Sequence, residues 1–381
     1  MDPVSIYNPK KLCFGSGCTD RMVSDYIASG RKRIFILSVE PVIHSIEHEL
    51  KKLKEHGIEL HIDTSLSSEP GFTDFHRVLG DARQFGPDSI AGIGGGSVMD
   101  LAKLIAAFMD VDEPVENSVG TGLVKSRNTH LVCAPTTSGT GSEVSPNSIL
   151  LDEEKGHKQG IISELLVPDA SYVDPQLTLG LPPDVTAYTG LDALVHCIEA
   201  YTNKYSHPVI DTYAIKGISL IYDHLREAVR NGSDLEARTN VALGSMYGGI
   251  CLGPVNTAAV HALAYPLGSD YRLAHGLSNA ILLPYIMEFN LESAVLKYAD
   301  IARAIGVPGS GSAYDMAYHA VERIRQLLHD CNIPVKLRDL GVKEESLESM
   351  AVSAFEVRRL LRNNPREVQV KDAYNIYKNA Y

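Results

Sequence analysis

One carboxylate and three imidazoles in the second half of the chain have the types and spacing of a metal site. Asp192 and His196 stand four residues apart in GLDALVHCIEAY, so a helix places both on one face. His261 follows in VHALAYPLG and His275 in AHGLSNAILLP. This donor set suits a first-row divalent metal, which would polarise an alcohol oxygen or a carbonyl. Taken alone, each histidine is more often a hydrogen-bonded core residue.

Three glycines and a serine, Gly94–Ser97, follow a predicted strand and open a predicted helix. Glycine lets a ligand approach the backbone, and the unpaired amides at a helix start favour an anion. A dinucleotide pyrophosphate meets that description, although a plain tight turn is the alternative. No G-x-G-x-x-G follows the first strand, so this is not the usual Rossmann fingerprint.

A second loop, PTTSGTGSE at 135–143, also follows a predicted strand. Five of its nine residues carry hydroxyls and two are glycine. Such a loop can bind ribose or phosphate through hydroxyls and bare amides. A helix entry with Thr140 or Ser142 as its N-cap is an equally good interpretation.

Short apolar runs alternate with helical patterns in the first half of the chain. The predicted strands are 34–37, 58–62, 89–93 and 130–134, and the predicted helices are 42–56, 75–85 and 98–108. This alternation of strands and helices indicates a parallel sheet covered by helices on both faces. The polar segment 113–129 is expected to be a loop.

After Pro182 and Pro183 the patterns become long and helical. The predicted helices are 184–203, 209–231, 234–249, 256–267, 276–288, 293–305 and 312–329. The sequence therefore predicts an α/β nucleotide-binding domain with a parallel sheet over 1–180. An all-helical metal-binding and substrate domain is expected over 181–381.

Composition excludes several classes of partner. The chain has 381 residues, of which 44% are hydrophobic and 22% charged, as in a globular protein. A net charge of -12 argues against nucleic acid or an anionic membrane as a partner. No apolar run is long enough to span a bilayer. Six cysteines without a C-x-x-C, and a start without an apolar signal core, favour the cytoplasm.

With these motifs in place, the chain resembles the iron-containing (group III) alcohol dehydrogenases over nearly its whole length. The shared motifs are FGSG at 14–17, GGGSVMDLAK at 94–103, PTTSGTGSEV at 135–144, GLDALVHCIEAY at 190–201, VHALAYPLG at 260–268, AHG at 274–276 and NPR at 364–366. The resemblance implies a dehydroquinate synthase-like fold with cofactor and metal between the two domains. It also implies hydride transfer between NAD or NADP and an alcohol, aldehyde or ketone.

The resemblance assigns roles to particular residues. Asp192, His196, His261 and His275 are expected to bind Fe²⁺ or alternatively Zn²⁺, and His261 and Tyr265 are expected to be catalytic. The expected cofactor-binding residues are Ser38, Gly94, Gly95, Gly96, Ser97, Asp100, Thr137, Ser138 and Thr140.

Two positions depart from the family pattern. Tyr265 stands where many members carry a second histidine near the nicotinamide, and a tyrosine hydroxyl is a weaker acid than an imidazolium. Val39, followed by Glu40, stands where members that prefer NAD often place an aspartate that binds the ribose hydroxyls. The proton path and the choice between NAD and NADP therefore stay open.

Other interpretations compete with an alcohol dehydrogenase. One is the glycerol dehydrogenase or dehydroquinate synthase branch of the same superfamily, and another is a nucleotide-binding relative without turnover. The partners expected are a small alcohol or aldehyde and further copies of the chain, in a homodimer or higher homo-oligomer. Arg272, between the last two ligands, could hold an acidic substrate group, although a surface arginine is the simpler interpretation.

Overall fold

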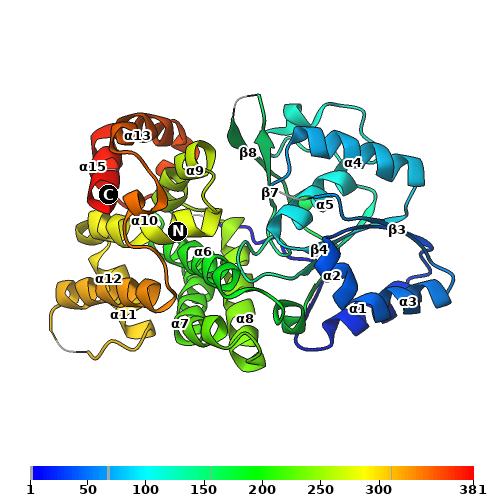
Figure 1. The fold of residues 1–381 in the computed structure, drawn as a ribbon, viewed down its shortest axis with the longest axis horizontal. Helices are drawn as coiled ribbons and strands as arrows, with labels where there is room; N and C mark the ends of the chain where they lie inside the picture. Colours follow the sequence, from blue (N-terminus) through cyan, green and yellow to red (C-terminus); the bar gives the residue numbers. More distant parts are fainter. Residues whose placement is uncertain (1–2, 67–68, 155, 310) are drawn as a thin grey trace. The chain divides into compact units, whose positions relative to one another are not determined.

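The computed structural model describes residues 3–66, 69–154, 156–309 and 311–381, and these form two compact units (Figure 1). The α/β unit comprises Ile6–Thr137 and Gly141–Gly180. Of the described residues, the helical unit comprises 3–5, Ser138–Thr140 and the chain from Leu181 to Tyr381. The short segment 138–140 therefore packs with a different unit from the loop residues on either side of it.

A six-stranded parallel sheet in the order β1-β9-β6-β4-β2-β3 forms the α/β unit. Its strands are β1 Lys11–Phe14, β2 Arg33–Leu37, β3 Glu59–Asp63, β4 Ser89–Gly94, β6 His130–Pro135 and β9 Ala170–Val173. Every residue of β4 is buried, because a central parallel strand is covered on both faces. The predicted α/β class and four predicted strands are confirmed.

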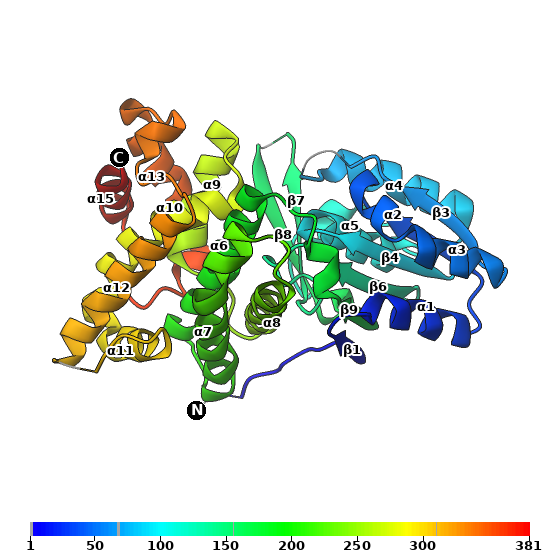
Figure 2. The same ribbon diagram turned by 60° about the horizontal axis from the view of Figure 1, so that its bottom comes forward.

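Helices cover both faces of this sheet (Figures 1 and 2). They are α1 Cys18–Ala28, α2 Glu40–Ser45, α3 Glu47–Glu55, α4 Phe72–Phe85 and α5 Gly96–Phe108. One apolar core joins the sheet to α4 and α5, and a second joins it to α1 and α3. A single helix over 42–56 is wrong, because the backbone leaves the helical region at Ile46, with φ -117 and ψ 19.

A smaller sheet adds three strands, β5 Gly120–Thr121, β7 Asn147–Asp152 and β8 His157–Ile162, in the order β5-β8-β7. The segment 113–129 is thus not wholly a loop, since it contains β5 and the 3-10 turn Val115–Ser118. The antiparallel β7–β8 pair begins a few residues after the loop that follows β6. It therefore adjoins the hydroxyl-rich segment in the sequence.

Long helices build the other unit, as predicted. They are α6 Pro183–Thr202, α7 Pro208–Arg230, α8 Leu235–Leu252, α9 Ala259–Tyr271, α10 His275–Asn290, α11 Val295–Ala304, α12 Ala313–Asp330, α13 Leu347–Glu356, α14 Arg358–Leu361 and α15 Val370–Ala380. Helix α6 packs against α7, α8 and α10, which makes it the centre of the unit. Among the described residues, none of the helices combines the length and the hydrophobicity that a membrane-spanning segment needs.

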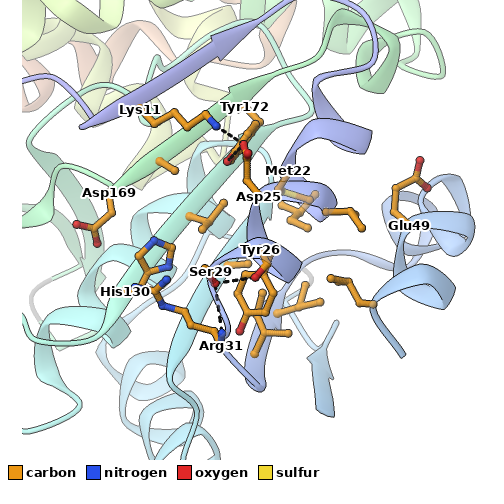
Figure 3. A pocket seen from close by; sticks show the side chains of 18 of the residues that line it. Lys11, Met22, Asp25, Tyr26, Ser29, Arg31, Glu49, His130, Asp169 and Tyr172 are labelled. Carbon is orange, nitrogen blue, oxygen red and sulfur yellow. Dashed lines mark hydrogen bonds and ion pairs between the residues drawn. The ribbon is translucent and has the colours of Figure 1, made fainter. Parts of the chain in front are cut away.

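A cavity of about 370 Å³ lies where α1 and α3 pack on the sheet (Figure 3). Its walls are mainly aliphatic, and polar groups stand around them. At one side Asp25 accepts hydrogen bonds from Lys11 and from the Tyr172 hydroxyl, the latter at 2.8 Å. His130 also lines the cavity, and its Nδ1 lies 3.0 Å from the Ser89 hydroxyl.

His130 should make folding sensitive to acid. Burial, and then the nearby Arg31, lower the pKa of His130 to about 4 from an ordinary value of 6.5. As the pH drops, His130 is therefore protonated in the unfolded chain before it is protonated in the folded chain. The free energy of unfolding decreases between about pH 6.5 and about pH 4. We expect His130→Gln to reduce the difference in melting temperature between about pH 7 and about pH 5. An identical difference in the variant and the wild type would contradict this assignment.

Candidate metal centre

Helix α6 carries three buried polar side chains on one face, Asp192, His196 and Glu199. Pro183 in the first turn has its φ already set for a helix, and Asp184 lies favourably at the positive end of the helix dipole. Spacings of four and three residues bring the three polar groups to one side. The apolar residues around them fix α6 in the middle of the unit.

Two further helices bring the remaining imidazoles to this face. His261 lies in the first turn of α9, and His275 is the first residue of α10. The chain reverses between these helices at Arg272, which has a left-handed φ of 55. Since only three residues separate α9 from α10, the two histidines are held at a fixed spacing.

Three imidazole nitrogens surround one oxygen of Asp192. The Oδ1 atom lies 3.6 Å from Nε2 of His261, 3.8 Å from Nε2 of His275 and 3.9 Å from Nε2 of His196. The Asp192, His261 and His275 ligand atoms all lie within 4.8 Å of one another. A tetrahedral site with bonds of about 2.1 Å has ligand atoms about 3.4 Å apart. Both the donor types and their spacing fit a divalent metal.

The electrostatics of the site favour a cation. Burial raises the pKa of the Asp192 carboxyl, but the three histidines outweigh it and hold that pKa well below its usual range. Burial lowers the pKa of His261, yet Glu199 and Asp192 together raise it to about 10. Burial lowers the pKa of His196, which keeps that imidazole neutral. A neutral imidazole and an ionised carboxylate are the forms that bind metals, so a metal that binds Nε2 of His261 must displace a proton from it.

Two residues that the sequence reasoning missed support the ligands. Oε2 of Glu199 lies 2.6 Å from Nδ1 of His261, and Oε1 accepts the Val260 amide at 2.6 Å. A carboxylate only accepts, so Nδ1 carries the proton and Nε2 is left for a metal. The Asn279 amide donates to Asp192 Oδ1 at 2.7 Å. The helical spacing of Glu199 from Asp192 and His196 was a usable signal, whereas nothing marked Asn279.

Glu199→Gln is expected to weaken metal binding by about 10- to 100-fold, the usual effect of losing such a supporting carboxylate. A glutamine keeps the size of the side chain but can turn its amide nitrogen toward His261. Competition between the protein and a chromophoric chelator for Zn²⁺ measures the affinity directly. Glu236→Gln, at an exposed position of α8, is the matched control. Equal affinities in the two variants would reduce Glu199 to a packing role.

In the α/β unit, the two predicted cofactor loops lie side by side. β4 and β6 are neighbours in the sheet, with Gly94 opposite Pro135, and the Thr136 amide donates to the Gly94 carbonyl at 3.0 Å. Gly95 has extended backbone and precedes α5, so the first amides of α5 have no helical partner. A Cβ on Gly95 would lie 3.5 Å from Thr137, an ordinary contact. At the carboxyl ends of β4 and β6, the backbone of Gly95 and the hydroxyl-bearing side chain of Thr137 therefore lie next to each other.

Some predicted cofactor residues form hydrogen bonds within the protein. Asp100 accepts hydrogen bonds from the Ser142 hydroxyl and from the Ile149 amide, the latter at 2.9 Å. The fully buried Lys103 donates to the Ser142 carbonyl and hydroxyl, both at 2.9 Å. α5 therefore holds the loop after β6 in place. Ser38 is also fully buried and donates to the Ile93 carbonyl at 2.7 Å. Direct contacts of Asp100 and Ser38 with a cofactor stay predictions.

The segment with Ser138 and Thr140 belongs to the helical unit, where a Cβ on Gly139 would collide with Thr189 of α6 at 2.9 Å. Cofactor binding by Ser138 and Thr140 also stays a prediction. Ser97 lies in the first turn of α5, beside Gly96.

Tyr265 lies one turn after His261 on α9. The centroid of its ring is 6.3 Å from that of the His275 imidazole. Its hydroxyl accepts a hydrogen bond from Nη2 of Arg359 at 3.2 Å. Arg359 stands 94 residues further along the chain, and nothing in the sequence joined it to this site. Arg272, which the sequence suggested as a partner for an acidic substrate group, is exposed and caps the C-terminal end of α9.

Two descriptions of one protein family match the chain. A family described as "Iron-containing alcohol dehydrogenase" matches residues 9–175, and its counterpart "Fe-containing alcohol dehydrogenase family, C-terminal" matches residues 186–381. Both the α/β unit and the helical unit are thus covered.

Individual proteins are similar over the whole length. Long-chain-alcohol dehydrogenase 1 of Geobacillus thermodenitrificans is 37% identical, covering 100% of this chain and 98% of that protein. The crystal structure of a 1,3-propanediol oxidoreductase has a TM-score of 0.96 at 33% identity, covering 100% of both chains. A sulfoacetaldehyde reductase from Bifidobacterium kashiwanohense, solved with NAD⁺, has a TM-score of 0.88 at 26% identity, covering 100% of this chain and 99% of that chain.

Proposed function

This chain belongs to the iron-containing alcohol dehydrogenase family, and from that premise we propose which of its residues carry out the reaction. The chain is an oxidoreductase of alcohols or aldehydes that uses a nicotinamide dinucleotide and iron. The expected family and the expected class of enzyme are therefore confirmed.

Asp192, His196, His261 and His275 hold one divalent metal. The observation that carries this assignment is the convergence of three Nε2 atoms on one carboxylate oxygen at 3.6–3.9 Å. When bound, the metal supplies polarisation of the substrate oxygen, while the nicotinamide exchanges hydride with the adjacent carbon. Glu199 fixes the tautomer of His261, and Asn279 orients the Asp192 carboxylate.

The turn formed by Gly94, Gly95 and Gly96, between the end of β4 and the start of α5, binds the dinucleotide pyrophosphate through bare backbone and the first amides of α5. Ser97 and Thr137 add hydroxyls there, and Asp100 and Lys103 hold the neighbouring loop. Glu40, the first residue of α2, follows the carboxyl end of β2. Its carboxylate suits ribose hydroxyls and opposes a 2′-phosphate, which favours NAD over NADP.

Tyr265 acts on the substrate rather than on the metal. Its ring lies close to the His275 imidazole, and its hydroxyl is held by Arg359. A hydroxyl that already accepts one hydrogen bond can donate its proton to a substrate oxygen. Tyr265 therefore orients the substrate beside the metal ligands.

The test is a steady-state assay of purified protein after loading with Fe²⁺ or Zn²⁺. A panel of alcohols and aldehydes with NADH and NADPH should give turnover that depends on added metal and prefers NADH. No turnover with any member of the panel, despite retained metal and cofactor binding, would favour a nucleotide-binding relative without activity. A homodimer or higher homo-oligomer and a cytoplasmic location are further proposals, and light scattering tests the first.

A further inference from the structure

Arg359 is a half-buried cation without a carboxylate partner. Its guanidinium donates a hydrogen bond to the Tyr265 hydroxyl at 3.2 Å, and no acidic group of the described residues lies within ion-pair distance of it. Two other half-buried arginines behave differently, since Arg127 pairs with Asp169 and Arg325 with Glu288. A partly desolvated charge is most stable with an opposite charge beside it.

The place of Arg359 suggests what the missing counter-charge is. Tyr265 separates its guanidinium from the imidazole of His275, whose ring lies 6.3 Å from that of Tyr265. Among the described residues, the carboxylates of Asp192 and Glu199 pair with His261, and their two negative charges match the two positive charges of a divalent ion. The charge of Arg359 is then left uncompensated, with the Tyr265 side chain between it and the proposed ligand His275.

We propose that the substrate carries an anionic group, a sulfonate, carboxylate or phosphate, a few bonds from its alcohol or aldehyde carbon, and that Arg359 binds this group. The planar guanidinium matches the spacing of two oxygens of such a group. Tyr265 can rotate its hydroxyl between the arginine and the anion. The inference rests on the proposed function, which it narrows to short hydroxy or oxo acids.

Paired aldehydes of similar length test the proposal in the metal-loaded enzyme. Sulfoacetaldehyde and succinic semialdehyde provide the anions, and butyraldehyde is the neutral reference. The wild type should prefer both anionic aldehydes in kcat/KM. Arg359→Leu should lower that preference by about 10- to 100-fold, mainly by raising KM for the anions. Arg359→Lys should restore part of it, and Arg362→Leu, at an exposed position of the same segment, should leave it unchanged.

A binding measurement separates this inference from the proposed function. Isethionate and 3-hydroxypropionate should raise the melting temperature of the metal-loaded wild type more than that of metal-loaded Arg359→Leu. Equal use of anionic and neutral aldehydes, with no effect of Arg359→Leu on their ratio, would overturn the anion site and leave the dehydrogenase intact. Absence of all turnover would overturn the dehydrogenase, and the melting temperatures would still decide whether Arg359 binds an anion.

Discussion

His261→Ala should abolish most of the turnover of the metal-loaded enzyme. Nε2 of His261 lies 3.6 Å from Asp192 Oδ1, nearer than the other two imidazoles, and Glu199 holds its other ring nitrogen. The variant loses one ligand and leaves the Glu199 carboxylate buried without its partner. A bound metal contributes several kcal/mol to such a reaction, so kcat should fall on the order of 10³-fold.

Elemental analysis of the same preparation should show much less retained metal than in the wild type. NADH binding should stay close to the wild-type affinity, because the glycine loop lies in the other unit of the chain. His319→Ala, at an exposed position of α12, is the matched control. A His261→Ala enzyme with full metal content and wild-type kcat would remove His261 from the ligand set.

Gly95→Val should produce the opposite result, lost cofactor binding with retained metal. A Cβ at this position meets Thr137 at an ordinary distance of 3.5 Å, so the fold tolerates it. The branched side chain would occupy the space into which a pyrophosphate must come to reach the amides of α5. We expect the dissociation constant for NADH to rise by about 10²-fold or more, or ~2.7 kcal/mol.

Titration by nicotinamide fluorescence measures that constant. Gly80→Val is the control, because Gly80 is exposed on α4 and a Cβ there meets nothing within 4 Å. The neighbouring Gly94 is a poor choice, since a Cβ there would lie 2.8 Å from Val98 and would damage the turn itself. Unchanged NADH affinity in Gly95→Val would move the cofactor site away from this loop.

Apolar runs predicted the centre of the large sheet and its edge strand β3, whereas β1 and β9 on the other side and the strands of the small sheet were missed. β2, β4 and β6 read as strands because nearly every residue in them is buried. β1 is a four-residue edge strand with partly exposed residues, and β8 is largely polar, so neither stood out. The apolar spacing continues across Ile46, whose side chain is buried in the core with α3, so the sequence pattern does not mark the break in the helix there.

The candidate site was predictable where residues share one helix or one motif. Asp192, His196 and Glu199 lie on one face of α6, so spacing alone could bring them together. His261 and His275 were joined to them by donor chemistry and by family resemblance. The Tyr265–Arg359 contact links α9 to α14 through tertiary packing, which leaves no periodic trace in the sequence.

All four proposed ligands belong to the helical unit, so metal binding would stabilise this unit against unfolding and proteolysis in a cell. A ligand that binds only folded protein adds to its stability, by about 2.7 kcal/mol at a hundred times the dissociation constant. That gain would fall on α6, α9 and α10, not on the sheet and its helices. Iron starvation would therefore shorten the survival of the helical unit against proteolysis first, and the supply of metal would govern how much enzyme persists as well as how fast each molecule works.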